Sequence, residues 1–253
     1  MASLDGVSMH EVDPRIVIQS VDETAPNWNV TAVSRAGRIG QYYTGTEKRY
    51  RDIVIKFAIR IIRDLPGREE VLQKVAAWAT GGHTLTVSYR EGQRLPVICS
   101  ALPAVQGIDR WAEAYQLTLR AYGIPDWIAA EAETETASGS SGTAALEVTA
   151  NGGGKLELSA VNSSSGNCNV VQVSVGTQVI RFENLGLASG ETLAVSYDDN
   201  DVMSAKIGTR SVLAKRTTAS ADDIWLESGE NTITYSSGQA LGWIFGCYGR
   251  WIG

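Results

Sequence analysis

The sequence has few of the residues on which catalysis and metal binding depend. Its 253 residues include only two histidines and three cysteines. Cys99, Cys168 and Cys247 lie far apart and form no C-x-x-C pair, so neither a zinc site nor a disulfide framework is expected, and each is interpreted as a small buried apolar residue. The motifs G-x-S-x-G, H-E-x-x-H and a strand-linked G-x-G-x-x-G are also missing. These absences argue against an enzyme and against a bound cofactor.

Long apolar runs are missing as well. No stretch approaches the ~20 apolar residues of a membrane-spanning helix, and the first 15 residues contain no apolar signal core. We therefore expect no membrane insertion and a protein that is made and assembled in a reducing cytoplasm.

Positive charge is scarce and unevenly placed. Residues 1–127 carry 15 Lys/Arg and 14 Asp/Glu, whereas residues 128–253 carry 7 and 14, which together give the net charge of −6. No basic stripe is available to neutralise phosphates, so specific nucleic-acid binding is not expected. An acidic surface would instead let DNA slide past without adhering.

The clearest regular pattern lies in residues 51–90. In residues 51–62 every second residue is apolar, which predicts a half-buried strand; these residues are Ile53, Ile55, Phe57, Ile59 and Ile61. A helix of about three turns should begin near Pro66 and end at Gly81-Gly82. Its apolar stripe consists of Val71, Leu72, Val75, Trp78 and Ala79. A second alternating strand follows at residues 84–90, so we expect a sheet with one helix laid across it.

Further strands are expected on both sides of this unit, at residues 15–21, 28–34, 93–101 and 114–121. Pro96 indicates that residues 93–101 form an edge strand, because proline cannot donate to a ladder.

Residues 35–48 are rich in arginine, glycine and tyrosine. Two interpretations stay open: a solvated hairpin, or an arm that contacts another subunit, because functional residues favour loops and Tyr and Arg favour interfaces. The candidate subunit-interface residues are Arg35, Gly37, Arg38, Gly40, Tyr42, Tyr43 and Lys48.

Composition changes sharply in the second half. Residues 129–154 are small, acidic and Gly/Ser-rich, which predicts a linker between an N-terminal domain at residues 1–128 and a C-terminal domain at residues 155–253. The C-terminal domain contains eight short strand candidates separated by Gly, Asn and Asp turns, which is typical of a jelly-roll-type β-sandwich. Both domains are therefore expected to be mainly β.

Four C-terminal features have both a functional and a structural interpretation. Trp225 and Trp243 are candidate sugar contacts, but they lie in apolar strand patterns that favour the core. The acidic run at residues 198–201 suits either calcium or a hairpin turn. Residues 152–155 (GGGK) are similar to a phosphate loop, but Leu156 stands where Ser or Thr is required.

The order of parts resembles the distal tail (Dit) proteins of siphophages. The resemblance rests on the Gly-Arg loop at residues 35–40, the strand–helix–strand unit and the domain end at Pro125-Asp126-Trp127, where the family has aspartate, proline and an aromatic residue in that order. In the second half it rests on residues 223–233 (DIWLESGENTI) and on residues 248–251 (YGRW).

This resemblance implies a tail-tube-like N-terminal β-sandwich with one flanking helix and a galectin-like or carbohydrate-module-like C-terminal domain. It implies a homo-hexameric ring at the tail tip of the virion, with DNA passing through the ring. The implied partners are the tail tube protein, the tail-tip hub protein, receptor-binding proteins and the tape measure. Two alternatives stay open: a carbohydrate-binding host-recognition protein that uses the C-terminal sandwich, and a cell-wall hydrolase, for which the sequence offers no nucleophile or metal set.

Overall fold

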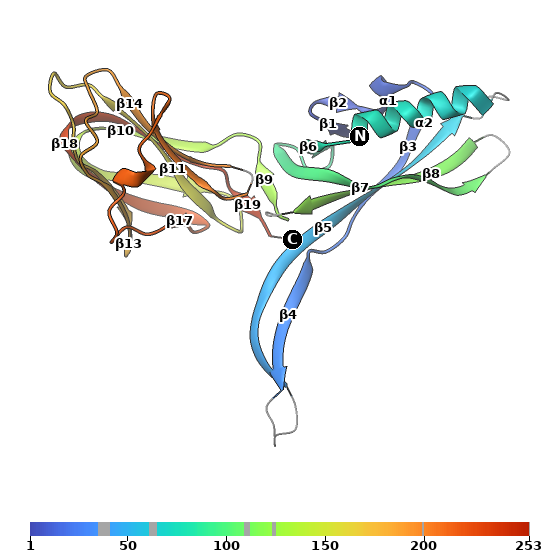
Figure 1. Cartoon of the computed structure of the whole chain (residues 1–253), viewed down its shortest axis with the longest axis horizontal. Coiled ribbons are helices and arrows are strands. Elements are labelled where there is room, and N and C mark those ends of the chain that lie inside the picture. The colour runs from blue at the N-terminus through green and yellow to red at the C-terminus, as the bar shows by residue number, and fades with distance from the viewer. Residues whose placement is uncertain (35–40, 61–64, 109–111, 123–124, 199, 253) are drawn as a thin grey trace. The chain divides into compact units, whose positions relative to one another are not determined.

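The computed structural model describes residues 1–34, 41–60, 65–108, 112–122, 125–198 and 200–252, with the backbone alone at 28–34, 41–49, 65, 105–108, 112–113 and 122. The chain divides into two compact units, unit 1 (Met1–Trp127) and unit 2 (Ile128–Ile252) (Figure 1). Both units are built mainly from antiparallel strands, so the predicted mainly-β fold class is confirmed.

One antiparallel sheet organises unit 1. Its strands lie side by side in the order β2-β1-β6-β7-β8-β5-β3, and β4 pairs with β5. The strands are β1 (Ala2–Leu4), β2 (Val7–Ser8), β3 (Ile16–Glu23), β4 (Asn27–Ser34), β5 (Gln41–Arg60), β6 (Gly82–Val87), β7 (Gln93–Ile108), β8 (Ala112–Tyr122) and the short β9 (Trp127–Ala129) at the unit's end.

The second half of β5 forms the centre of this sheet, between β3 and β8. Ile53, Ile55, Phe57 and Ile59 are all at most 3% exposed, so the predicted alternation is confirmed at these positions, while Ile61 lies outside the described residues. Arg51 has the same phase along the strand and is 1% exposed. A charged side chain therefore occupies the position at which the apolar face of β5 begins.

Helix α2 (Leu65–Ala79) crosses one face of the sheet and packs against β7 (Figure 1). Val71, Val75 and Ala79, spaced four residues apart, are fully buried, which confirms the predicted apolar stripe at these positions. Gly81 then adopts φ +113°, a left-handed conformation that favours glycine at the end of a helix. A short helix, α1 (Met9–Val12), precedes β3 and is capped at its start by Ser8 and Glu11.

Two predictions for unit 1 are wrong in detail. Strand β5 begins at Gln41, ten residues before the predicted strand, because β4 supplies a ladder partner there. Strand β7 lies between β6 and β8 and is not an edge strand. Pro96 lies opposite Thr84 of β6, and the ladder with β8 begins only at Ile98, so no backbone N–H is needed on the β8 side at the proline.

Unit 2 is an antiparallel β-sandwich. Its strands are β10 (Glu133–Val148), β11 (Gly154–Asn162), β12 (Val171–Val175), β13 (Gln178–Phe182), β14 (Thr192–Tyr197), β15 (Met203–Ile207), β16 (Arg210–Ser211), β17 (Trp225–Leu226), β18 (Gly229–Cys247) and β19 (Arg250–Trp251), with a 3-10 helix at Leu213–Lys215.

The long strand β18 belongs to both layers of the sandwich. Its first half pairs with β12, from Thr234 to Ser237, and its second half pairs with β11, from Leu241 to Cys247. Strand β10 follows β18 along almost its whole length, and the register shifts between Gly139 and Ser141, where β18 passes from one layer to the other. The two layers enclose one core, in which apolar residues of β12 and β13 face those of β11 and β14.

The linker predicted at residues 129–154 is wrong, because Glu133–Val148 is strand β10. The small residues of β10 accommodate the large aromatic side chains of β18. A Cβ atom on Gly142 would lie 2.6 Å from the hydroxyl oxygen of Tyr235. The indole nitrogen of Trp243 donates a 3.0 Å hydrogen bond to the carbonyl oxygen of Gly139. A composition typical of a linker therefore also suits a strand that lies against bulky neighbours.

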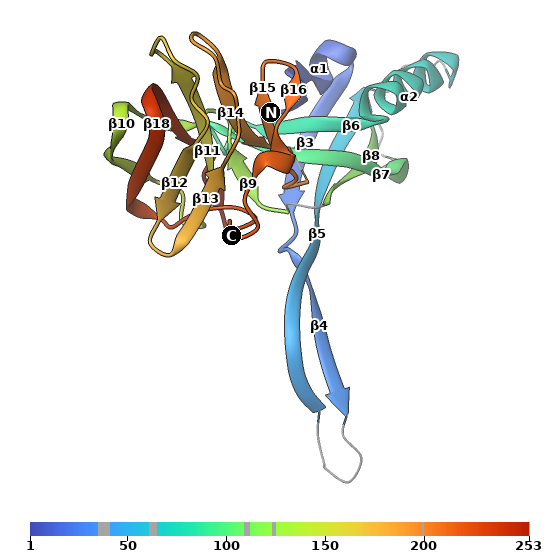
Figure 2. The same cartoon turned by 60° about the vertical axis from the view of Figure 1, so that its left-hand side comes forward.

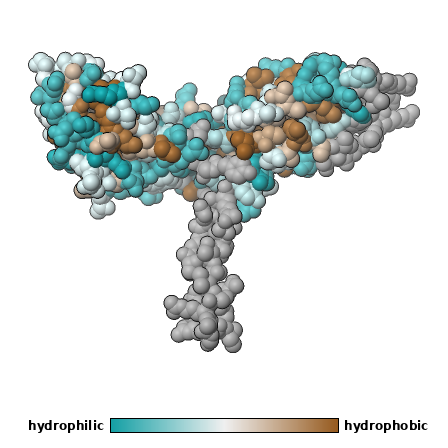
Figure 3. All heavy atoms as spheres, in the orientation of Figure 1, coloured by the Kyte–Doolittle hydropathy of each residue, from teal (hydrophilic) through white to brown (hydrophobic). Residues whose placement is uncertain are grey.

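Apolar surface on the face of the molecule shown in Figure 3 is broken into small patches separated by polar residues in each unit. Among the described residues, none of the helices has both the length and the apolar character of a membrane span.

Candidate functional site

The most distinctive feature of unit 1 is a two-stranded hairpin formed by β4 and the first half of β5. The ladder runs from Asn27 opposite Tyr50 to Ser34 opposite Gln41. Figures 1 and 2 show this hairpin extending away from the rest of the sheet of unit 1. Eight strand residues at ~3.3 Å each give it a reach of about 25 Å.

Three of the candidate interface residues lie along this hairpin. Tyr42, Tyr43 and Lys48 belong to β5 and pair with Val33, Ala32 and Trp28 of β4. Arg35, Gly37, Arg38 and Gly40 lie outside the described residues. Both interpretations of residues 35–48 predict a projecting element in this region. Strands β4 and β5 form such an element.

The hairpin is attached to the sheet through reciprocal hydrogen bonds. The backbone nitrogen of Thr24 donates to the carbonyl oxygen of Asp52 at 3.0 Å, and the backbone nitrogen of Asp52 donates to the Thr24 hydroxyl at 3.0 Å. The Asp52 carboxylate accepts two hydrogen bonds, of 2.5 and 2.8 Å, from the guanidinium of Arg120 on β8. The same guanidinium lies 3.9 Å from the ring centroid of Tyr50. These contacts fix the point at which the chain leaves the sheet and returns to it.

A largely buried group of charged and aromatic side chains lies beside this attachment point, with Glu23 and Arg90 partly exposed. We call it the root cluster; its members are Glu23, Arg51, Arg90, Asp126 and Trp127. Arg51 and Trp127 are at most 1% exposed, and Asp126 is 7% exposed. Two carboxylates face two guanidinium groups, so the formal charges within the cluster cancel, as burial of ions requires.

Glu23 is the centre of the root cluster. Its carboxylate accepts hydrogen bonds of 2.8 and 3.0 Å from Arg90, 2.9 Å from the indole nitrogen of Trp127 and 3.3 Å from Arg51. Burial alone would raise the pKa of Glu23, but the hydrogen bonds from Arg90 and Trp127 outweigh it and hold that pKa below its ordinary value. Glu23 is therefore an ionised, fully engaged carboxylate and not a general acid.

The sequence contained signals for the root cluster that the analysis of motifs missed. Arg51 continues the phase of the apolar residues of β5, which marks it as an inward-facing charge in need of partners. Asp126 and Trp127 come from the Pro125-Asp126-Trp127 end of the domain, on which the resemblance partly rested. No sequence pattern indicates that Trp127 contacts Glu23, because the two residues are 104 positions apart.

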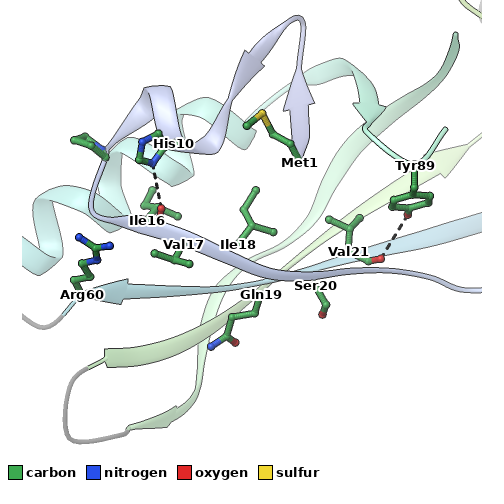
Figure 4. A pocket seen from close by; sticks show the side chains of 11 residues that line it. Met1, His10, Ile16, Val17, Ile18, Gln19, Ser20, Val21, Arg60 and Tyr89 are labelled. Atoms are coloured by element: carbon green, nitrogen blue, oxygen red, sulfur yellow. Dashed lines mark hydrogen bonds between the residues drawn. The ribbon is translucent and has the colours of Figure 1, made fainter. Parts of the chain in front are cut away.

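A groove runs along the outer edge of β3 (Figure 4). Its volume is about 610 Å³, and its lining includes Met1, His10, Val17, Arg60 and Tyr89. Val17 and Tyr89 are 44% and 55% exposed, so the groove has an open, partly apolar wall. Among the described residues that line the groove, none carries a carboxylate.

The two candidate sugar contacts in unit 2 have different environments. Trp243 is 1% exposed and packs against Tyr235 and Phe245, with ring centroids 4.9 and 5.9 Å away. The sugar-contact prediction for Trp243 is wrong, because a buried ring has no free face. Trp225 is partly exposed, and the guanidinium of Arg250 lies 5.1 Å from its ring centroid.

One of the two histidines, His83, and the acidic run at residues 198–201 have structural partners. His83 Nδ1 lies 2.7 Å from Asp5, and its Nε2 lies 3.1 Å from the carbonyl oxygen of Thr80. The Asp198 carboxylate accepts hydrogen bonds of 2.9 Å from the backbone nitrogens of Asn200 and Val202, as in a turn. Among the residues that the structure describes, no group of three or more His, Cys, Asp or Glu side chains is placed to hold a metal ion.

The glycine run at residues 152–154 is explained by close packing. Cβ atoms at Gly152 and Gly154 would meet Ile252 and Cys247 at 2.6 Å, and one at Gly153 would lie 2.2 Å from the carbonyl oxygen of Leu226. The segment leads into strand β11, whereas a phosphate loop leads into a helix.

The fold is similar to that of a known phage tail protein of the Dit type. The crystal structure of the Dit protein of phage SPP1 matches this chain with a TM-score of 0.71 at 10% sequence identity, and the match covers 98% of each chain. Two structures of the phage p2 baseplate in its activated conformation match with TM-scores of 0.46 and 0.44 at 8% and 6% identity, over 92% of this chain and 91% of theirs.

No protein-family model and no curated protein matches the sequence. The resemblance to distal tail proteins is therefore confirmed through the fold, at a sequence identity of 10%.

Proposed function

We propose that this protein is a structural, non-enzymatic component of the tail tip of a long-tailed phage. Six copies form a ring that joins the tail tube to the tail-tip hub and the receptor-binding proteins. The observation that carries this proposal is the match to SPP1 Dit over 98% of both chains, because it includes both units and the hairpin between β3 and the sheet centre. SPP1 Dit is described as a paradigm of the hub adsorption apparatus in phages that infect Gram-positive bacteria.

The β4–β5 hairpin is the element that we assign to the contact between neighbouring subunits. A two-stranded hairpin is marginally stable in water on its own. Here its base is held by Thr24, Asp52 and Arg120, whereas residues 27–34 pair only with β5 among the described residues. A neighbouring subunit would supply the missing packing, and one arm used six times closes a ring with a single type of contact.

The charge of the chain supports passage of DNA through such a ring. A net charge of −6 offers no field that would retain a polyanion, so DNA would move through the channel without strong adhesion. The tail tube, hub and tape measure proteins are the expected neighbours in the assembled tail.

A second candidate function, binding of host-wall sugars by unit 2, now rests on Trp225. Its ring is partly exposed, and a partly exposed indole offers an apolar face on which a sugar ring can stack. The nearby Asp223 carboxylate is paired with Lys155 at 2.8 Å, so the ring itself is the proposed contact.

Shortening the hairpin tests the ring proposal. Residues 30–46 are replaced by Asn-Gly, which joins Asn29 to its ladder partner Glu47 through a two-residue turn and keeps Thr24, Asn27, Tyr50 and Asp52. We expect folded monomers from this variant and rings from the full chain. A matched control carries a two-residue insertion at Gly176-Thr177, the turn between β12 and β13 in unit 2, and should still form rings. Intact rings from the shortened variant would overturn the role assigned to the hairpin.

A further inference from the structure

The root cluster brings together the two ends of the hairpin and the exit from unit 1, and Arg90 joins these three segments from the connection between β6 and β7. Glu23 is the last residue of β3, and the hairpin begins four residues later at Asn27. Arg51 directly follows Tyr50, the residue at which the hairpin ladder ends. Trp127 is the last residue of unit 1, so the chain enters unit 2 at the next residue. The start of the hairpin, its return to the sheet and the exit from unit 1 therefore meet at the carboxylate of Glu23, whose side chain is 15% exposed.

The geometry of these contacts is directional. Arg90 donates to both oxygens of Glu23 through Nε and Nη2, which fixes the guanidinium plane relative to the carboxylate. The same guanidinium lies 5.1 Å from the ring centroid of Trp127, whose indole nitrogen donates to Glu23 Oε2. Arg51 reaches Glu23 at 3.3 Å on one side and Asp126 at 4.0 Å on the other. A displacement of any of the three segments changes the hydrogen-bond geometry of the other two.

Stability alone does not account for charges at these positions. Arg51 occupies the next inward position of a strand face that continues as Ile53, Ile55 and Phe57, where an apolar side chain would extend the core. Replacing buried ion pairs with apolar residues of similar volume is often neutral or stabilising. Charged groups form directional hydrogen bonds, which fix the mutual orientation of the segments that carry them. Apolar contacts do not have this directionality.

We propose that the root cluster is a mechanical coupling device in which Glu23 links the base of the hairpin to the point where the chain leaves unit 1. A change in the direction of the hairpin is transmitted through Glu23 to Trp127, and a change at Trp127 is transmitted back, since coupling between two sites is reciprocal. If the hairpin contacts a neighbouring subunit, as proposed above, binding of that neighbour would change the contacts of Trp127, the residue directly before unit 2. The coupling itself belongs to a single chain and does not depend on ring formation.

Hydrogen exchange measured by mass spectrometry on the full chain tests this coupling. Trp127→Phe removes the indole N–H and keeps an aromatic ring, and Glu23→Gln removes the charge and keeps the shape. We expect each substitution to accelerate exchange about fivefold both at residues 24–27 and 50–52 and at residues 126–129, as the loss of about one net hydrogen bond implies. Asp22→Asn, which alters an exposed ion pair with Lys56 on the same two strands, is the matched control and should leave residues 126–129 unchanged.

The decisive result is the effect of Trp127→Phe at the base of the hairpin, which this substitution does not touch directly. Faster exchange at residues 24–27 and 50–52, with unchanged exchange in β7 and β8, would support the coupling. Unchanged exchange at residues 24–27 and 50–52, or a uniform increase throughout unit 1, would overturn it. Because exchange is compared at one oligomeric state, a protein that forms no rings would refute the proposed function without affecting this test.

Discussion

The carboxylate of Glu23 accepts a 2.9 Å hydrogen bond from the indole nitrogen of Trp127, a residue 104 positions further along the chain. This contact links the last residue of unit 1 to the end of the edge strand β3, beside the base of the hairpin. The partners of Glu23 are two arginines and a tryptophan, so the carboxylate contributes to stability in its ionised form.

The dependence of stability on pH follows from this engagement. The pKa of Glu23 is lower in the folded protein than its ordinary value of 4.5, so the stabilisation is fully present above pH 4.5 and is lost as the pH falls through the lower, folded-state pKa. We predict that Glu23→Gln lowers the free energy of unfolding by about 1 kcal/mol at pH 7, because it removes the charge that Arg90 and Arg51 face, while Asp126 still lies beside Arg51. Urea titrations should show the same difference in free energy of unfolding between variant and wild type at pH 7 and pH 5, and a smaller difference at pH 3. A gap that widens would contradict the assignment.

The ion pair between Asp52 and Arg120 should be a second determinant of how the hairpin is attached. Its two hydrogen bonds are parallel, and both side chains are at most 26% exposed, which favours a measurable contribution. A double-mutant cycle with Asp52→Asn and Arg120→Met should give a coupling free energy of about 1 kcal/mol. The Asp22–Lys56 pair, about half exposed on both sides, serves as the comparison and should give a smaller value. Equal coupling in the two cycles would argue against a special role for Asp52.

Two glycines of unit 2 form a matched pair for testing close packing. Gly153 and Gly176 both have positive φ, +68° and +55°, but a Cβ atom at Gly153 would meet the carbonyl oxygen of Leu226, whereas Gly176 faces open space. We predict a loss of about 2–4 kcal/mol for Gly153→Ala and about 1 kcal/mol for Gly176→Ala. Thermal unfolding of both variants measures the difference. Similar losses would show that backbone conformation, and not packing, explains the glycine run.

Tryptophan substitutions separate the core role from sugar binding. Trp243→Ala should cost about 3–5 kcal/mol, because it removes a fully buried ring from the aromatic cluster. Trp225→Ala should cost less, because that ring is partly exposed. If unit 2 binds a wall polysaccharide, Trp225→Ala should abolish binding on a glycan array and Trp243→Phe should preserve it. Binding that survives Trp225→Ala would contradict the role proposed for Trp225.

Local patterns predicted much of the fold. The alternation at Ile53, Ile55 and Phe57 and the stripe at Val71, Val75 and Ala79 each reflect one buried face, so a short window of sequence was sufficient. Strand β10 was missed because its small residues are dictated by Tyr235 and Trp243, about 100 positions away. Composition alone cannot distinguish a flexible segment from a strand that lies against large aromatic side chains.

Some features of the candidate site could also be predicted from the sequence, and others could not. The projecting element between residues 28 and 50 could be anticipated from its Gly, Arg and Tyr content and from the resemblance to distal tail proteins. The root cluster could not, because each contact of Glu23 joins segments that only the folded sheet brings together. Trp243 shows the opposite error: its residue type suggested a sugar contact, and its position in β18 buries it.

The central claim is the ring, and mass photometry of the purified full chain, with negative-stain images of the same sample, tests it most directly. Six chains of 27.1 kDa give a species of about 163 kDa. The account predicts this species, either alone or after addition of the tail tube or hub protein, and ring-shaped particles in the images. A protein that stays at the mass of one chain in the presence of both partners would contradict it.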